Sequence, residues 1–315
     1  MTTSPLLLPW PLRGRLEAAV ASLYRPPGGM AEDFARPVGE AALIAPDSLS
    51  WLVFKNPVTM FIGGVAAVIL ELAEPRVRTG VWEHTSFRTQ PLQRMRRTAL
   101  ATAVTVYGPR SRAEALIARV SQLHARVRGA TPQGAPYRAD DPQLLDWVQA
   151  TAAFGFLEAW CAYVQPLSAA ERDRFYAEGE PAARRYGAVH APRSQAEVAA
   201  LFDAMRDRLQ PSEIVGEFLR IVGDMPALPA PLRPMQRVYI RAAVAILPPW
   251  LRELLALDAD WALAPWQRVL ASRSAVAADR LLLRSSPAVQ SCRRLGLPDD
   301  WLYRPRQIHG LPAAS

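Results

Sequence analysis

The stretch "NPVTMFIGGVAAVILELAEP", residues 56–75, decides how the chain folds. Asn56 is a typical helix cap and Pro57 suits the first helical position, where the backbone needs no N–H group. Nearly every residue that follows is apolar, so the helix has no polar face to turn toward water. Gly63–Gly64 interrupt the run, which is shorter than a bilayer-spanning helix. We therefore expect a buried central helix.

The helical period extends over most of the remaining chain. Capping boxes begin at Ser168 and Ser194, each followed by glutamate three residues later. The segment "LSWLVF", residues 49–54, is too short and isolated to imply a sheet, and residues 129–142 have the composition of a loop. The pattern favours one all-α domain of about ten helices over residues 1–285, followed by an irregular tail over 286–315. Further helices are expected over residues 91–108, 111–129, 141–165, 168–187, 194–209, 212–223, 232–247 and 248–257.

The composition is that of a globular protein, half apolar and about one-fifth charged. Two cysteines, Cys161 and Cys292, cannot form a disulfide framework, and no dense cysteine–histidine spacing is present. The apolar stretch near the N-terminus has no basic residue before it and is broken by prolines, unlike a secretory signal. We expect a cytoplasmic protein without a transmembrane segment.

The basic charge is concentrated in one region. Lys55 is the only lysine, and residues 88–128 hold nine arginines against the single acid Glu114. A basic face of this kind could bind nucleic acid. No recognition motif accompanies it, so we expect arginines that face solvent or an anionic ligand, and no nucleic acid.

Several chemical signatures are missing. The sequence has no glycine-rich phosphate loop, no nucleophile elbow, no HExxH motif and no paired carboxylates. An enzyme built from this chain would take its difficult chemistry from a cofactor.

His124, in "LIARVSQLHARVRG" (residues 116–129), is the best candidate for a cofactor ligand. It follows Ile117 by seven residues and Val120 by four, which places the imidazole within the apolar stripe of its helix. A hydrogen-bonded core histidine is one interpretation. A neutral imidazole on a rigid helix also suits the axial position of haem iron.

Arg94 and Thr98 form a second candidate group on the preceding helix. They are four residues apart and share one flank of its apolar stripe. An arginine in such a place matches a carboxylate, for example a haem propionate, although an ordinary surface arginine would fit the same pattern. Arg97 points away from this stripe.

His84, with Glu83 beside it in "GVWEHTSFR" (residues 80–88), lies in a short connection between two expected helices. Functional loops often have this character, while a turn histidine bonded to backbone is the alternative. His190 and His309 lie in proline-rich connections and receive no role.

Four segments occur in an order that resembles one oxygenase family. That family is typified by the bacterial latex-clearing protein (rubber oxygenase) and by the fungal oxygenase that cleaves the mycophenolic-acid side chain. The resemblance covers residues 40–260. The segments are "GVWEHTSFRTQPLQRMRRTALATAVTVYG" (80–108), "HARVRG" (124–129), "YRADDPQLLDWVQAT" (137–151) and "PLSAAERDRFYAE" (166–178).

The resemblance implies an all-α fold with a globin-like core that binds haem b. It assigns His124 as the proximal iron ligand and places Arg94 and Thr98 near the haem. Rubber oxygenases have a lysine where this chain has Arg97, and many bacterial relatives have histidine where it has Gln149. Arginine stays protonated, so we expect that Arg97 does not bind iron.

A base directed at oxygen must then come from another residue, and the nearest candidates in sequence are Glu71, Glu83 and His84. The resulting hypothesis is a haem-b-dependent oxygenase that acts with O2 on a lipophilic, isoprenoid-like small molecule. Three alternatives stay open: a non-catalytic helical protein that carries haem or a lipophilic ligand, a nucleic-acid-binding protein, and non-haem iron held by His84, His124 and a carboxylate.

Overall fold

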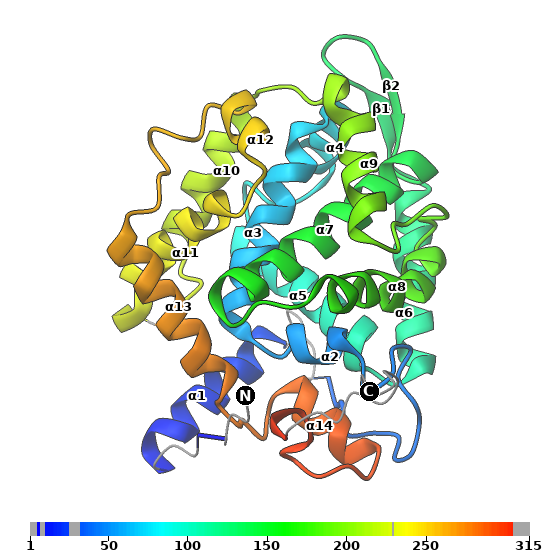
Figure 1. The fold of residues 1–315 in the computed structure, drawn as a ribbon. Helices are drawn as coiled ribbons and strands as arrows, with labels where there is room; N and C mark the ends of the chain where they lie inside the picture. The colour runs from blue at the N-terminus through cyan, green and yellow to red at the C-terminus, as the bar shows by residue number, and fades with distance from the viewer. Residues whose placement is uncertain (1–4, 7–9, 25–31, 229, 305–315) are drawn as a thin grey trace, which may run out of the picture.

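A computed structural model describes residues 5–6, 10–24, 32–228 and 230–304, and confirms the all-α fold (Figure 1). In these residues there are fourteen α-helices, rather than about ten. The first eight are α1 (Trp10–Leu23), α2 (Leu49–Val53), α3 (Pro57–Ala73), α4 (Pro75–His84), α5 (Pro91–Tyr107), α6 (Arg110–His124), α7 (Pro142–Tyr163) and α8 (Ala169–Arg185). The others are α9 (Gln195–Met205), α10 (Glu213–Asp224), α11 (Arg233–Ala245), α12 (Pro249–Leu254), α13 (Pro265–Asp279) and α14 (Pro287–Arg294).

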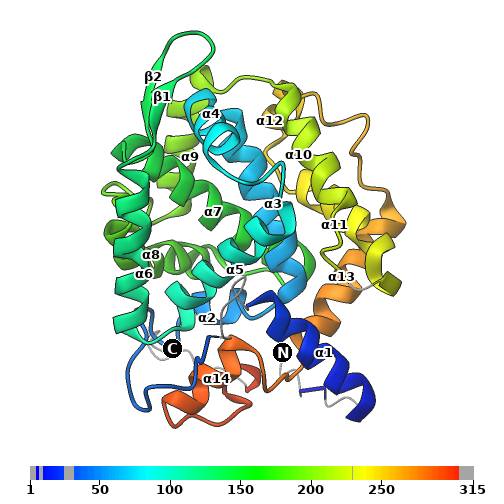
Figure 2. The same ribbon diagram turned by 180° about the vertical axis from the view of Figure 1, so that it is seen from behind.

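Helix α3 runs through the centre of the molecule, as its uniformly apolar sequence predicts (Figures 1 and 2). Asn56 caps it, and its side chain accepts hydrogen bonds from the N–H groups of Val58 and Thr59 at 3.0 and 3.2 Å. Helices α4, α7, α10, α11 and α13 pack around α3. No single helix in the described part of the chain is long and apolar enough to cross a membrane.

The closest helix contact is the crossing of α3 and α7, and it depends on two glycines. A Cβ atom added to Gly63 would lie 2.7 Å from the carbonyl oxygen of Gly155, and one added to Gly155 would lie 2.4 Å from the oxygen of Gly63. Both obstacles are backbone atoms, which cannot move aside as a side chain would. The fully buried Trp147 and Trp160 precede and follow Gly155 on α7.

Lys55 fixes the start of α3 to the end of α13. Its ammonium lies 2.6 Å from the carboxylate of Asp279 and also donates to that residue's carbonyl at 2.6 Å. The ring of Tyr303 lies 4.8 Å from the same ammonium. Only 3% of the lysine side chain is exposed, so the pair is shielded from solvent and from salt.

The tail predicted as irregular over residues 286–315 is wrong in its first part, because it contains α14 and a short 3-10 helix, Trp301–Tyr303. Arg294 holds α14 against the body. Its guanidinium is fully buried and donates to the carbonyls of Phe34, Glu40 and Tyr107 at 2.7–2.8 Å. The eight residues of α14 are too few to show a clear helical period, and their buried side includes Arg294 beside Val289 and Cys292. His309 lies outside the described residues.

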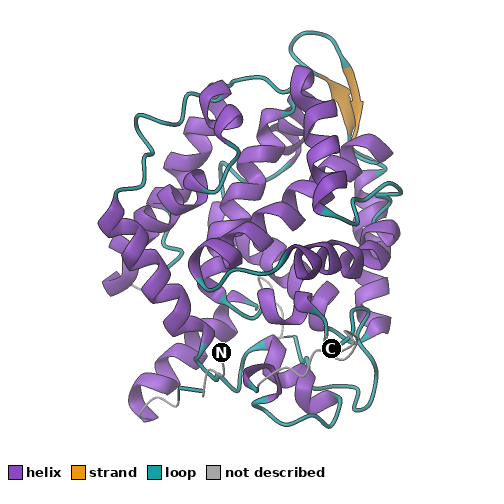
Figure 3. Ribbon diagram, viewed as in Figure 1, coloured by secondary structure: helices purple, strands orange, loops and turns teal. Residues whose placement is uncertain are grey.

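Residues 49–54 form no sheet, as expected: Leu49–Val53 are the helix α2, which Ser48 caps by accepting from the N–H of Trp51 at 3.2 Å. One further expectation needs correction. The expected loop after α6 is a hairpin of β1 (Arg128–Ala130) and β2 (Pro136–Arg138), drawn as the two strands in Figure 3. Helix α6 therefore ends at His124, and Gly129 lies in a strand rather than at a helix stop.

We predict that Gly155→Ala destabilises the fold by about 2 kcal/mol or more, because the new methyl group meets the backbone of α3. The matched control is Gly64→Ala. Its Cβ would meet only the ring of Phe156, at 3.8 Å, so we expect a stabilisation of about 0.5–1 kcal/mol from the better helix former. Urea unfolding followed by circular dichroism measures both, and equal effects would contradict the crossing as a tight contact.

Candidate functional site

His124 ends helix α6, which packs against α5 (Figure 2). Ala113 and Ile117 are buried in the predicted apolar stripe, while Leu123 is 51% exposed, so the stripe is wrong at that position. The imidazole is half-buried. Its Nδ1 atom is fully buried and has no hydrogen-bond partner among the described residues. The prediction that this histidine faces the protein interior is confirmed.

The surroundings of His124 keep its imidazole neutral. Burial lowers the pKa of His124, and the guanidinium of Arg94 lowers it further, while Asp140 opposes the change. A neutral imidazole keeps one nitrogen lone pair free, which a metal ligand requires. Two more buried polar atoms on the same helix pair, Ser121 Oγ on α6 and Arg96 Nε on α5, also lack a partner within the part of the chain that the structure describes.

Arg94 and Thr98 come together on α5, as their spacing predicts. The guanidinium of Arg94 donates to Thr98 Oγ1, which in turn donates to the carbonyl of Arg94 at 3.1 Å. Thr98 is exposed and Arg94 is half-buried. Burial lowers the pKa of Arg94, and the nearby carboxylate of Glu71 opposes this effect. The guanidinium of Arg94 is thus a partly buried cation, and a planar guanidinium has more N–H groups than its bond to Thr98 uses.

Glu71, on the last turn of α3, is the acid that faces Arg94. Burial raises the pKa of Glu71 to about 7, although the guanidinium of Arg94 acts in the opposite direction. Arg94 therefore interacts with both Glu71 and His124, and these side chains from α3, α5 and α6 form one group. A carboxyl with a pKa near 7 can accept or release a proton at neutral pH.

Arg97 points outward, as expected from the helical wheel, although its charge adds to the lowering of the pKa of Arg94. It is exposed and donates to Ser86 Oγ at 2.6 Å, which ties the loop after α4 to α5.

Glu83 and His84 form a different cluster, around Tyr137 of the hairpin. They are the last two residues of α4 and are exposed. The hydroxyl of Tyr137 lies 3.0 Å from His84 Nε2 and donates to Glu83 Oε2 at 3.4 Å. The tyrosine ring is buried, and its pKa is raised by burial and by Glu83. The catalytic roles of Glu83 and His84 stay a prediction.

Tyr137 is not predicted as a site residue from the sequence: it begins "YRADDP", which looks like a loop, although the same segment is part of the family resemblance. Gly129 leaves room for it, since a Cβ there would lie 2.7 Å from the tyrosine oxygen. Because β1 and β2 follow directly on α6, this cluster attaches the chain beyond His124 to α4.

The donor set fits haem better than a bare metal ion. Within the described ranges, no three histidine, cysteine, aspartate or glutamate side chains gather where they could hold an ion, so His84 and His124 do not form a facial triad with a carboxylate. One neutral imidazole with an unpartnered buried nitrogen, one guanidinium and one hydroxyl instead match an axial ligand and partners for propionates.

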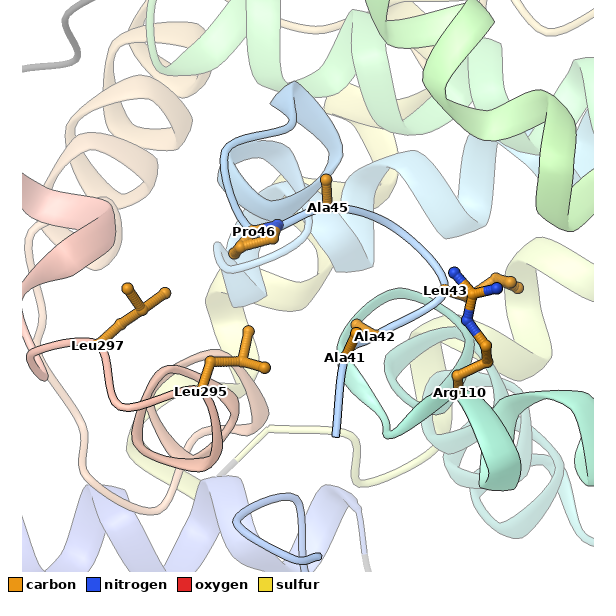
Figure 4. Close-up of a pocket in the computed structure, with 8 residues that line it drawn as sticks. All are labelled: Ala41, Ala42, Leu43, Ala45, Pro46, Arg110, Leu295 and Leu297. Atoms are coloured by element: carbon orange, nitrogen blue, oxygen red, sulfur yellow. The ribbon is translucent and has the colours of Figure 1, made fainter. Parts of the chain in front are cut away.

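The hollow in Figure 4, of about 460 Å³, is not part of this site. It is lined by Ala41, Ala42, Leu43, Ala45 and Pro46, by Leu295 and Leu297 beyond α14, and by Arg110. Arg110 begins α6 and His124 ends it, so the hollow and the imidazole lie about 20 Å apart along that helix. A second hollow, between α10 and α11, also lacks the site residues.

We predict that Glu71 makes stability fall as pH rises. Its carboxyl binds a proton more tightly in the folded state, where its pKa is about 7 rather than 4.5, so the stabilisation is complete below pH 4.5 and is lost as pH passes 7. We expect a loss on the order of 1–3 kcal/mol over this window, absent in Glu71→Gln.

Urea unfolding of the cofactor-free protein at a series of pH values tests this. Glu114→Gln, which removes an exposed glutamate of α6, is the control and should keep the pH dependence of the wild type. Identical pH profiles for the wild type and Glu71→Gln would contradict the prediction.

Comparison with known proteins gives one match. The family described as "ER-bound oxygenase mpaB/B'/Rubber oxygenase, catalytic domain" matches residues 51–278. No curated protein and no solved structure matches the chain. The matched range contains every residue of both clusters, and it covers well over half of the 315 residues. The chain therefore belongs to the mpaB and rubber oxygenase family of oxygenase catalytic domains.

Proposed function

We propose that the protein is a haem-b-dependent oxygenase that acts on a lipophilic small molecule in the cytoplasm, and that His124 would hold the haem iron. The observation that carries the proposal is the buried, unpartnered Nδ1 atom of a histidine kept neutral by burial and by Arg94. Membership of an oxygenase family supports the reaction class.

In this proposal the haem, when bound, supplies the binding and activation of O2. Arg94 would hold a propionate through its planar guanidinium, and Thr98 keeps that guanidinium oriented by accepting one of its hydrogen bonds. This charge-assisted contact would also offset part of the negative charge of the propionate, which would lie beside the half-buried Arg94.

Glu71 would be the acid–base group of the site. Its raised pKa lets the carboxyl hold or pass on a proton at neutral pH, and the guanidinium of Arg94 keeps its charged form accessible. The alternative, a non-catalytic haem carrier, needs no acid–base group. The raised pKa of Glu71 therefore supports turnover.

The apolar character of the surrounding helices supports a lipophilic substrate. Leu92, Met95 and Ala99 form the half-buried stripe of α5 beside Arg94, and Val68 lies on α3 one turn before Glu71. Surfaces of this kind bind a hydrocarbon chain through desolvation. Oxygen uptake with isoprenoid alkenes tests this part: haem retention without uptake would favour the carrier instead.

We predict that His124→Ala abolishes stable haem binding. Purified protein reconstituted with haem should show a Soret band in the wild type and little or none in the variant, while circular dichroism stays the same because alanine favours the helix. His190→Ala is the control, since this exposed histidine lies outside the candidate site and its backbone N–H, which alanine keeps, donates to Asp146 at 2.9 Å. Normal haem retained in folded His124→Ala would refute the ligand assignment.

We predict that Arg94→Lys weakens haem retention by on the order of 1–3 kcal/mol, because lysine keeps the charge but loses the planar fork. Arg94→Ala should weaken it further. Rates of haem transfer to apomyoglobin measure both variants. Arg97→Ala is the control, because Arg97 is exposed and bonded to Ser86. Equal rates for all three variants would show that Arg94 does not contact the cofactor.

A further inference from the structure

Helix α13 lies at the surface, but its large apolar residues are exposed and its small ones are buried, the reverse of an ordinary surface helix. Its buried side carries the small residues Ala271 and Ala275, followed by Asp279. Its solvent-exposed side carries large apolar residues. The exposed large apolar residues of α13 are Trp266, Val269, Leu270 and Val276, with exposed fractions of 64, 50, 37 and 36%.

This concentration is unusual for the molecule. Nine large apolar residues are exposed in the described part of the chain, and four of them lie on this one 15-residue helix. Single exposed apolar side chains need no explanation, whereas a contiguous group marks a surface that another body covers. We call Trp266, Val269, Leu270 and Val276 the α13 face.

The charges around the α13 face are mainly basic. Arg273 is exposed and falls between Trp266 and Val276 on the helical wheel. Arg268, also exposed, lies on the opposite side of the helix, toward Tyr163 of α7. The acid of the helix, Asp279, is buried and paired with Lys55. In the preceding loop Asp258 pairs with Arg252, and Asp260 is exposed. The neighbouring helix α11 contains three arginines and no acid.

We infer that α13 docks the protein on the surface of an anionic lipid bilayer. A helix that lies in the plane of the membrane needs apolar residues on one side and cations beside them, with tryptophan at the level of the headgroups. The α13 face meets each requirement, and α13 lies at the edge of the molecule in both views (Figures 1 and 2). Arg273 can extend its charged end to lipid phosphates while its stem stays among the apolar residues.

A second copy of the chain fits this surface less well. A two-fold contact through the α13 face would bring Arg273 of each copy toward the other, and like charges in a closed interface are costly. The four apolar side chains of the face also project from one exposed helix rather than from a lined hollow: neither of the two hollows described above includes an α13 residue. An exposed apolar helix face suits insertion among lipid headgroups.

Flotation with lipid vesicles tests the inference on the full chain, and its readout is independent of haem. The vesicles contain phosphatidylcholine alone or phosphatidylcholine with about one-third phosphatidylglycerol. We expect the wild type to bind the anionic vesicles. Arg273→Gln should weaken binding about fivefold, and the double variant Trp266→Ser/Val269→Ser about tenfold or more.

Two matched controls separate the α13 face from general charge and hydrophobicity. Val38→Ser/Val189→Ser removes two exposed apolar side chains outside α13, and Arg119→Gln removes an exposed arginine of α6. Both should bind like the wild type. Three results would overturn the inference: no binding by the wild type, equal binding by the α13 variants, or a dimer in light scattering that Trp266→Ser/Val269→Ser converts to a monomer.

Discussion

The backbone contact between Gly63 of α3 and Gly155 of α7 is the constraint on which the remaining structure depends. Two helices can approach this closely only where neither carries a side chain, and the contact fixes both their separation and their register. The end of α3 carries Glu71, while α7 begins directly after the hairpin that follows His124. Glu71 and His124, 53 residues apart in sequence, both lie within electrostatic range of Arg94.

That arginine gives the candidate site its electrostatic character. Arg94 favours the charged form of Glu71 and the neutral form of His124, while burial favours the neutral form of both. Burial and Arg94 therefore both lower the pKa of the His124 imidazole. For the Glu71 carboxyl the two effects oppose each other, because burial raises its pKa and Arg94 lowers it. A metal ligand needs a neutral imidazole, whereas a proton-transfer group needs a carboxyl with a pKa near the working pH. A single cation within electrostatic range of both groups contributes to both conditions.

The sequence predicts those parts of the site that follow from the period of an amphipathic helix. The inward orientation of His124, the pairing of Arg94 with Thr98 and the outward orientation of Arg97 all follow from residues three or four apart. From the sequence, Glu71 is a candidate only because it is near the other site residues in the chain. Helix α3 is apolar on all sides, so its helical period does not show which way Glu71 points. Tyr137 and the partners of Glu83 and His84 arise from a hairpin whose strands are three residues long, too short to show alternation. The globin-like arrangement of the core stays a prediction.

The burial of Lys55 has a consequence for the chemistry of the whole surface. The chain contains no other lysine, and this one is enclosed by Asp279 and Tyr303. The 315 residues therefore present no accessible ε-amino group to acylating reagents, amine-directed cross-linkers or enzymes that modify lysine. The positive surface consists of guanidinium groups, which keep their charge at every physiological pH and are poor nucleophiles. The protein thus carries a permanent cationic surface that lysine acetylation cannot neutralise.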